Sequence, residues 1–366
     1  MAIKFVHQTA RKVMDNPAAN PRIKALARGL GYLSPISEAL VRLRLFCYRT
    51  NICRTFRLGR RVISVGNITV GGTGKTPLVA YLTALFKERG KAVVILSRGY
   101  RRKGKGVEVI SNGKGLLTSR EKSGDEAYFL ARLSGGVPIV VGKNRVRAGE
   151  LAIERFDPDV ILLDDGFQYL PLEREVDLVV IDSSNPFGTG RILPGGILRE
   201  PLSSLKRADI FCLSRTDQAQ DLDRLRALLR SINPEAPIFE CIHSPSFLRR
   251  IPGGEKVDVR LLRGRRLFAF SAIGNPMAFE RTLTDLGARL VGVRSYIDHY
   301  SYTTADIKEI AQQAKGSGAE FIVTTAKDMV RLPGGYHPCI EVFALEIRIE
   351  ITRGADIIES IINPEA

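Results

Sequence analysis

Short apolar runs alternate with segments of helical periodicity from residue 61 to about residue 232. The apolar runs are rich in β-branched residues and predict strands, whereas apolar positions three or four residues apart predict helices. Strands are expected at 61–67, 91–100, 106–111, 137–143, 159–168, 176–182 and 208–214. Helices are expected at about 76–89, 124–133 and 219–231. Because strands and helices alternate, we expect a parallel sheet with helices on both of its faces.

The pattern is interrupted near residues 233–266, where Pro and Gly accumulate. Such a stretch is typical of a connection between domains. Alternation then resumes, and it predicts a second, smaller α/β domain from segments at 266–274, 276–287, 319–325 and 339–363. An N-terminal segment, a first domain, a linker region and the smaller domain are therefore expected at 1–60, 61–235, 236–265 and 266–366.

A basic amphipathic helix is predicted at residues 34–50. Ser34 is a suitable N-cap and Pro35 suits the first helical position. The apolar residues that recur at helical spacing are Ile36, Leu40, Leu43, Phe46 and Cys47, and the arginines off that stripe are Arg42, Arg44 and Arg49. A helix of this type lies in a membrane interface or packs its stripe on its own domain, and periodicity alone leaves both open.

Charge is distributed unevenly along the chain. Its 366 residues carry a formal net charge of +16. Residues 1–61 contain 13 Lys and Arg but only two acids, Asp15 and Glu38, which is +11 in the first sixth of the sequence. This asymmetry indicates an anionic partner surface, either a membrane or a nucleic acid.

Several classes of protein are disfavoured by composition. With 44% hydrophobic residues, the chain has enough apolar side chains for a substantial core. No apolar run is long enough for a bilayer-spanning helix, and the N-terminus lacks a secretory signal pattern. The five cysteines are scattered without a C-x-x-C, so neither a disulfide framework nor a zinc site is expected.

A phosphate-binding loop is predicted in "SVGNITVGGTGKTPLV", residues 64–79, which follows a strand and opens a helix. Thr69 stands where the usual G-x-x-x-x-G-K-[ST] spacing has its first glycine. Lys75 is expected to reach the outer phosphates and the Thr76 hydroxyl to bind Mg²⁺. The residues expected to hold the nucleotide are Gly71, Gly72, Thr73, Gly74, Lys75 and Thr76. A merely structural strand–helix turn is the alternative, which Gly-Lys-Thr disfavours.

Acidic residues follow at two further places. Asp164-Asp165 ends an apolar strand, an arrangement typical of a Mg²⁺-binding strand beside a phosphate-binding loop. Asp125 and Glu126 begin a predicted helix, where helix capping is an equal alternative. His299 follows an acid among tyrosines, and taken by itself its role is undecided. No guanine-reading [NT]-K-x-D and no protein-kinase H-R-D or D-F-G set is present.

Taken in order, the motifs resemble one family. They are "VGNITVGGTGKTPLV", "LSRGYRRK", "GDEAYFLA", "LDDGFQ", "LREPLSSLKRAD", "FSAIGNP", "DHYSYT" and "VTTAKDMVRL". Together they are similar to the tetraacyldisaccharide 4′-kinases, the lipid A 4′-kinases of Gram-negative bacteria, over about residues 30–333. The resemblance implies a P-loop NTPase-like α/β/α domain and a smaller α/β/α domain joined by a strand linker, with the active site between them.

This resemblance also implies an activity. The family transfers the γ-phosphate of ATP, with Mg²⁺, to the 4′-hydroxyl of tetraacyldisaccharide 1-phosphate, which gives lipid IVA. It works as a peripheral protein on the cytoplasmic face of the inner membrane, so the basic helix is expected to contact that surface reversibly. We further expect a monomer that binds no nucleic acid.

The resemblance extends to individual residues. The Asp of the GDE motif pairs with the His of the D-H-Y motif and assists deprotonation of the sugar hydroxyl, and the matching residues are Asp125 and His299. Lys75 matches the phosphate-binding lysine. Metal ligation is implied for Thr76, Glu126 and one or both of Asp164 and Asp165. Substrate contacts are implied for Arg98, Tyr100, Arg101, Gln168, Arg199 and Glu200. Departures from the family pattern occur in "DHYSYTT" and "TTAKD", where an acid is expected before the lysine.

Two other functions are compatible with a phosphate-binding loop and a basic N-terminal segment. A nucleic-acid-dependent ATPase would use the basic N-terminal segment, yet its charges interleave with aliphatic residues at helical spacing. A membrane-attached regulatory NTPase would make Asp125 and His299 dispensable. The combined motif set favours the kinase over both.

Overall fold

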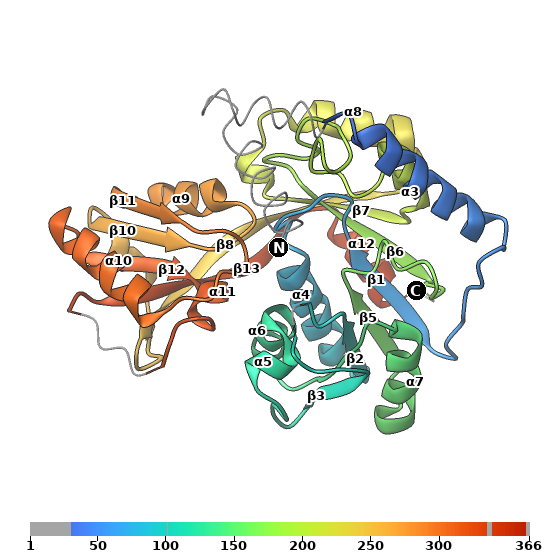
Figure 1. The fold of residues 1–366 in the computed structure, drawn as a ribbon, viewed down its shortest axis with the longest axis horizontal. Coiled ribbons are helices and arrows are strands. Elements are labelled where there is room, and N and C mark those ends of the chain that lie inside the picture. Colours follow the sequence, from blue (N-terminus) through green and yellow to red (C-terminus); the bar gives the residue numbers. More distant parts are fainter. Residues whose placement is uncertain (1–30, 101, 335–338, 364–366) are drawn as a thin grey trace.

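The computed structural model describes residues 31–100, 102–334 and 339–363. Within these residues one 13-stranded sheet runs through both lobes of the molecule (Figure 1). In spatial order its strands are β11 (Arg289–Ser295), β10 (Arg266–Ser271), β12 (Phe321–Thr325), β13 (Val342–Arg353), β8 (Ile238–Ile251), β7 (Ile210–Ser214), β6 (Val176–Asp182), β1 (Arg61–Gly66), β5 (Val160–Asp164), β2 (Val93–Ser97), β4 (Pro138–Val141) and β3 (Glu108–Asn112), with β9 (Lys256–Val257) beside β8. The predicted α/β class is confirmed.

The first lobe is built on parallel strands whose side chains are buried on both faces. Neighbouring residues of β1 illustrate this: Ile63 and Val65 join the core on one face of the sheet, whereas Val62 joins the core on the other. This continuous burial is why the strands read as unbroken apolar runs. The lobe's helical elements are α4 (Lys75–Glu88), α5 (Arg120–Ser123), α6 (Asp125–Leu133), α7 (Arg145–Phe156), α8 (Leu222–Ile232), η1 (Leu202–Arg207) and η2 (Thr216–Gln218).

The second lobe repeats this layering on a smaller scale. Leu267 and Ala269 of β10 share a core with Phe279 of α9 (Pro276–Asp285). The alternate residues Phe268 and Phe270 share one with the buried face of α10 (Thr304–Gly316). The remaining helical elements of this lobe are η3 (Val259–Leu262) and α11 (Ala326–Met329). Helices therefore cover both faces of this part of the sheet as well.

Two long antiparallel strands join the lobes. β8 and β13 pair from Ile251↔Val342 to Glu240↔Arg353 with two register shifts along the way, so one hydrogen-bonded ribbon belongs to both lobes (Figure 1). After β13, α12 (Ala355–Ile362) returns to the first lobe and packs Ile358 into its core. The last helix of the predicted C-terminal domain thus contributes to the core of the first lobe. The domain boundaries at 60, 235 and 265 stay predictions.

Several elements differ from the expectation. The pattern did not predict α7, β8, β11 and α10. Residues 238–251, inside the expected linker, form the strand β8, because β13 pairs with them although they contain Pro245. The strand expected at 159–168 ends at Asp164, since Asp165 has φ +55° and turns the chain out of the sheet.

The amphipathic helix is present as α3 (Ser34–Arg49), at the edge of the first lobe (Figure 1). Its N-terminus is fixed by Ser34, whose hydroxyl donates to the Ile192 carbonyl and accepts from the Gly195 amide. The apolar side chains Ile36, Leu40, Leu43 and Phe46 are all exposed. The rest of the predicted N-terminal segment, residues 1–30, lies outside the described residues. No helix among the described residues is long and apolar enough to cross a membrane.

Candidate active site

The second half of the phosphate-binding loop has the geometry that the glycines predicted. Gly71 and Gly74 have φ of +120° and +95°, and α4 begins at Lys75 directly after them. A side chain at Gly74 would also meet the His243 ring, with a Cβ–Nε2 distance of 2.6 Å. Backbone conformation and close packing therefore both require glycine here. The loop ends at a helix N-terminus, which favours phosphate binding.

The first half of the loop is an extended segment. The Val70 amide donates to the Ile197 carbonyl at 2.8 Å, the Arg199 amide donates to the Ile68 carbonyl at 2.7 Å, and Thr69 bridges to Leu198. Extended backbone suits a β-branched residue, which explains why Thr69 replaces the usual glycine. The same pairing brings the segment that carries Arg199 to the loop.

The carboxylates at the end of β5 have opposite environments. Asp165 lies 3.4 Å from Lys75 Nζ and 2.9 Å from Arg199 Nη1. Burial acts to raise its pKa, but Lys75 and Arg199 outweigh it and lower the pKa to about 2. Asp164 is 3% exposed, and burial, together with the charges of Glu126 and Asp165, raises its pKa to about 7. The site thus holds excess negative charge around Asp164.

These acids fit a divalent cation. Asp164 Oδ1 is buried without a hydrogen-bond partner, and its other oxygen has only a 3.4 Å contact from Ser97 Oγ. A buried carboxylate of this kind is stabilised by a cation. Among the described residues, no three His, Cys, Asp or Glu side chains converge closely enough to hold a metal unaided. Mg²⁺ is usually held in proteins through one or two carboxylates, water and substrate phosphates, and Asp164 offers one such carboxylate.

A cavity of about 1010 Å³ opens above the loop and is lined by residues from both lobes. The predicted site residues in its wall are Gly71, Gly72, Thr73, Gly74, Lys75, Thr76, Arg98, Tyr100, Glu126, Asp164, Asp165, Gln168, Arg199 and His299. Asp125 is not in the wall but lies 4.0 Å from His299, which is. Glu200 is also absent from the wall, because it is buried and paired with Arg207 at 2.9 Å. Arg101 lies outside the described residues.

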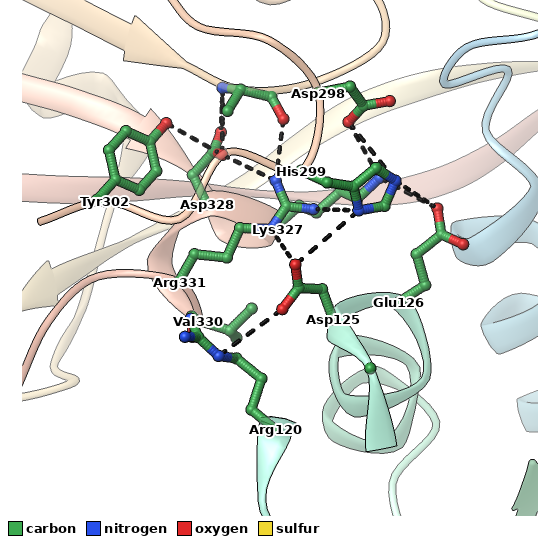
Figure 2. Close-up of polar contacts among 12 residues, drawn as sticks. Arg120, Asp125, Glu126, Asp298, His299, Tyr302, Lys327, Asp328, Val330 and Arg331 are labelled. Atoms are coloured by element: carbon green, nitrogen blue, oxygen red, sulfur yellow. Dashed lines mark hydrogen bonds and ion pairs between the residues drawn. The ribbon is translucent and has the colours of Figure 1, made fainter. Parts of the chain in front are cut away.

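The two lobes meet at the start of α6. Gly124, with φ +86°, precedes Asp125 and Glu126, the first residues of that helix. Their side chains face His299 and Lys327 of the second lobe (Figure 2). His299 Nδ1 lies 4.0 Å from Asp125 Oδ2, and His299 Nε2 lies 3.4 Å from Glu126 Oε1. The structure therefore brings together Asp125 and His299, which are far apart in the sequence.

Electrostatics stabilise this contact between the lobes. Burial opposes ionisation of Glu126, but Lys327 and His299 outweigh it and hold the pKa of this carboxyl well below its usual range. Burial likewise acts to lower the pKa of Lys327, but Asp298 and Glu126 raise it above the usual value. Lys327 Nζ lies 3.5 Å from Glu126 and 3.8 Å from Asp298. Both groups are thus charged near neutral pH.

A second contact between the lobes holds the phosphate-binding loop itself. Arg215 donates to the Gly72 carbonyl at 2.9 Å and pairs with Asp182 at 2.5 Å. Asn275 of the second lobe donates to Asp182 at 3.1 Å. Beside it, Gly274 packs so closely that an added Cβ would lie 1.9 Å from the Gly72 amide nitrogen. A shift of the second lobe would therefore displace the phosphate-binding loop.

Sequence reasoning missed several residues at this boundary. Asp298, Lys327, Arg331, Arg215 and Asn275 carry chemistry at the site, but none was predicted as a site residue. Four of them lie in quoted motifs: Asp298 in "DHYSYT", Lys327 and Arg331 in "VTTAKDMVRL", and Asn275 in "FSAIGNP". The motifs gave their positions, whereas no spacing rule indicated that they face the first lobe.

The comparisons with known proteins agree with one another. A family model described as tetraacyldisaccharide-1-P 4′-kinase matches residues 26–364. The tetraacyldisaccharide 4′-kinase of Halothermothrix orenii is 40% identical over 315 residues, 82% of each chain. That of Syntrophus aciditrophicus is 41% identical over 340 residues, 89% of this chain and 90% of its own. Among solved structures, an "apo" form of LpxK from Aquifex aeolicus in complex with ATP has a TM-score of 0.71, with 32% identity and coverage of 92% of this chain and 98% of that one.

Proposed function

We infer that this chain binds ATP and phosphorylates the 4′-hydroxyl of tetraacyldisaccharide 1-phosphate in lipid A biosynthesis, because it belongs to the tetraacyldisaccharide-1-phosphate 4′-kinase family. One structural observation supports this inference most strongly. The phosphate-binding loop and His299, beside Asp125, face a single cavity between the lobes. A bound nucleotide and an acceptor hydroxyl could meet there.

The first lobe supplies the groups for the nucleotide. Lys75 and the helix N-terminus behind it would neutralise the outer phosphates. Thr76, Glu126, Asp164 and Asp165 are the residues proposed to hold Mg²⁺. When bound, Mg²⁺ supplies charge neutralisation at the phosphoryl oxygens. Asp165 differs from Asp164 because it already pairs with Lys75 and Arg199, so Asp164 is the better direct ligand of the two.

The lobe boundary supplies the groups for the acceptor. A sugar hydroxyl has a high pKa, so its transfer reaction needs a nearby proton acceptor. We assign this task to the Asp125–His299 pair, which forms only when the lobes are in contact. Arg98, Tyr100, Gln168 and Arg199 line the same cavity and are proposed to bind the substrate. Glu200 is instead proposed to act through Arg207, its partner in the ion pair.

The lipid substrate requires access to a membrane, and α3 offers a surface for it. Its apolar residues Ile36, Leu40, Leu43 and Phe46 are exposed rather than packed on the first lobe. From the same helix, Arg44 lies in the cavity wall and donates to the Gln168 carbonyl at 2.9 Å. We propose that α3 lies in the cytoplasmic surface of the inner membrane with the cavity opening beside it.

A product assay tests the function. Purified protein is given ATP, Mg²⁺ and tetraacyldisaccharide 1-phosphate dispersed in vesicles, and phosphorylation is located on the disaccharide. The expected product carries phosphate at the 4′ position, and its formation requires the lipid. Lipid-independent ATP hydrolysis stimulated by DNA or RNA, with no 4′-phosphorylation, would overturn the assignment.

A vesicle-binding assay tests the membrane proposal. Replacement of Leu40 and Leu43 by Ser should reduce co-sedimentation with vesicles of anionic lipid, while ATP binding stays unchanged. Replacement of the exposed Leu228 of α8 by Ser is the matched control, because it removes a similar apolar side chain from a different helix. Equal vesicle binding by all three proteins would exclude α3 as the membrane contact.

A further inference from the structure

Two residues at the end of β7 hold the phosphate-binding loop from one side. Ser214 is the last residue of that strand, and its hydroxyl donates to the Thr73 carbonyl at 2.8 Å. Arg215 follows it, and Nη2 of its guanidinium donates to the Gly72 carbonyl at 2.9 Å. Two consecutive side chains therefore bind two consecutive carbonyls of the loop.

The backbone at Arg215 makes this double contact possible. Successive side chains of a strand point to opposite faces of the sheet. Arg215 leaves this pattern with a φ of +53°, a left-handed conformation that is unfavourable for a residue with a side chain. Such strain persists only where the surrounding contacts hold it. The sharp turn after β7 thus brings the side chains of Ser214 and Arg215 to the same loop.

A buried ion pair fixes the guanidinium of Arg215. Its Nη1 lies 2.5 Å from Asp182 Oδ2, and the two side chains are only 11% and 8% exposed. Asp182 ends β6, and the register of the sheet places it directly beside Ser214. The other oxygen of Asp182 accepts from the Ser184 hydroxyl at 2.7 Å. A buried network whose groups are satisfied in this way restricts side-chain orientation.

The hydroxyl of Ser214 has a single proton to donate. It lies 2.8 Å from the Thr73 carbonyl and 3.3 Å from the Ile181 carbonyl, so the loop is the nearer acceptor. Ser214 is also 1% exposed, which excludes water as a competing partner. The hydrogen bond to the loop is therefore the main contact of this hydroxyl.

These contacts determine which way the loop amides point. In a planar trans peptide, the carbonyl and the following N–H point in opposite directions. The Gly72 carbonyl faces Arg215, so the Thr73 amide is directed away from β7. The Thr73 carbonyl faces Ser214, so the Gly74 amide is directed the same way. These loop residues line the cavity, and successive amides that point to one side form a concavity for anions.

We propose that Ser214 and Arg215 are positioning residues for phosphoryl transfer: they bind two carbonyls of the phosphate-binding loop and thereby hold the next two amides toward the phosphates of ATP. The proposal rests on the proposed function, in which this loop binds ATP. Ser214 is absent from the cavity wall, so it acts through the loop rather than on the nucleotide. Arg215 lies in the wall, but both of its terminal nitrogens already have partners in the protein.

Both positioning residues belong to the first lobe. The second lobe adds one donor, because Asn275 contacts the same Asp182 oxygen that pairs with Arg215. The orientation of the loop amides is therefore set within the first lobe, and contact with the second lobe reinforces it.

The first test observes the loop directly and needs no kinase activity. Labelling threonine carbonyls with ¹³C and glycine amides with ¹⁵N selects Thr–Gly peptides, which occur in the chain only at 73–74 and 189–190. Thr189→Ser removes one of the two signals and so assigns both. Ser214→Ala removes the donor to the Thr73 carbonyl, and the ¹³C and ¹⁵N signals of peptide 73–74 should both shift. Those of peptide 189–190 should stay in place.

The second test measures affinity for inorganic tripolyphosphate by calorimetry, because this anion carries the phosphates of ATP without base or sugar. Ser214→Ala should raise Kd about 3–10-fold, the usual scale of one hydrogen bond. Ser183→Ala is the matched control. Ser183 follows β6 and is also buried, but its hydroxyl has no hydrogen-bond partner among the described residues. Its replacement should leave Kd unchanged.

Arg215→Lys separates positioning from stability. Lysine keeps a positive charge beside Asp182, so Tm should change little, but it lacks the fork that reaches the carboxylate and the Gly72 carbonyl together. Kd for tripolyphosphate should rise about 10–100-fold, the scale of hydrogen bonds made by charged groups. Arg226→Lys is the control, since it alters a comparable ion pair, with Glu240 at 2.6 Å, on α8. It should leave Kd unchanged even where Tm falls.

Three outcomes would overturn the proposal: an unshifted peptide 73–74 in Ser214→Ala, wild-type Kd in both positioning variants, or an equal rise of Kd in Ser183→Ala. Failure of the proposed function itself looks different. The wild type would then make no 4′-phosphorylated product, while the peptide signals and the tripolyphosphate affinities would still report whether Ser214 and Arg215 orient the loop.

Discussion

Two groups of charged residues border the cavity, and the chain assembles them in different ways. Lys75 lies after β1, Asp164 ends β5 and Asp165 follows it. The two strands are hydrogen-bonded neighbours, since Val65 of β1 pairs with Asp164 of β5. Asp125 and His299 belong to different lobes and meet only where those lobes touch. The first group is fixed by the sheet, whereas the second depends on the position of the second lobe.

This difference separates two tasks within one active site. Groups fixed by a sheet edge can bind nucleotide whatever the other lobe does. Groups that meet across a boundary are complete only in one arrangement, so the acceptor chemistry is gated by lobe contact. Loss of the first group should therefore abolish nucleotide binding and turnover together. Loss of the second should abolish turnover alone.

The largest effect is expected at the sheet edge. Lys75→Ala removes the cation next to the outer phosphates and should lower kcat/KM about 10³-fold or more, on the scale of charge-stabilising groups in phosphoryl transfer. ATP affinity, measured by calorimetry, should fall as well. Lys87→Ala is the control, because Lys87 lies on the same helix but only donates to the Gly135 carbonyl on the surface. Wild-type ATP affinity in Lys75→Ala would contradict the assignment of this loop.

The next effect concerns the boundary. Asp125→Ala and His299→Ala should each lower kcat about 10²–10⁴-fold, the usual contribution of general acid–base groups, with little change in ATP affinity. The double variant should be no worse than the more damaging single variant, because the two residues act as a unit. Near-normal kcat in both single variants would remove the pair from the mechanism and favour a regulatory NTPase.

The same contrast explains what the sequence could predict. Lys75 and Asp164 were predicted because a short motif and the rule for parallel strands together specify where such residues lie. Asp125 and His299 were paired only through the family resemblance, since no local spacing relates two lobes. Arg331 was not predicted at all, because a buried arginine looks like any surface arginine in sequence. The strand β8 was missed for a similar reason: its partner β13 lies about one hundred residues further on.

A smaller effect is expected where the two regions touch. Gly274→Ala places a Cβ 1.9 Å from the Gly72 amide nitrogen, so either the second lobe or the loop must shift. We expect kcat to fall about tenfold and KM for ATP to rise, since a displacement near 1 Å is costly in a positioned site. Gly316→Ala is the control, because Gly316 ends a helix and no atom lies within 4 Å of an added Cβ there. Gly264→Ala is less suitable, because Gly264 has φ +75° and alanine would strain the backbone. An unchanged KM and kcat in Gly274→Ala would show that the loop is independent of the second lobe.

The smallest effect concerns the pH dependence of protein stability that Asp164, the last residue of β5, and its neighbour Asp165 each contribute. Burial raises the pKa of Asp164 to about 7, so the folded state binds its proton more tightly than the unfolded state. Its contribution to stability is therefore lost as pH rises from about 4 through 7. Asp165 has the opposite sign, because Lys75 and Arg199 overcome burial and lower its pKa to about 2. Its contribution is present above about pH 4 and is lost as pH falls toward 2.

The two asparagine variants should consequently move Tm in opposite directions at pH 8 without nucleotide or Mg²⁺. Asp164→Asn removes the cost of ionising a buried carboxyl and should raise Tm by about 5 °C, given that each kcal/mol shifts Tm by about 2–4 °C in a protein of this order of size. Asp165→Asn leaves Lys75 and Arg199 without their shared carboxylate and should lower Tm by a similar amount. At pH 5 the gain from Asp164→Asn should shrink, because wild-type Asp164 is then mostly protonated. A shift of the same sign in both variants would mean that the sheet edge treats the two acids alike, and the choice of Asp164 as the direct metal ligand would lose its physical basis.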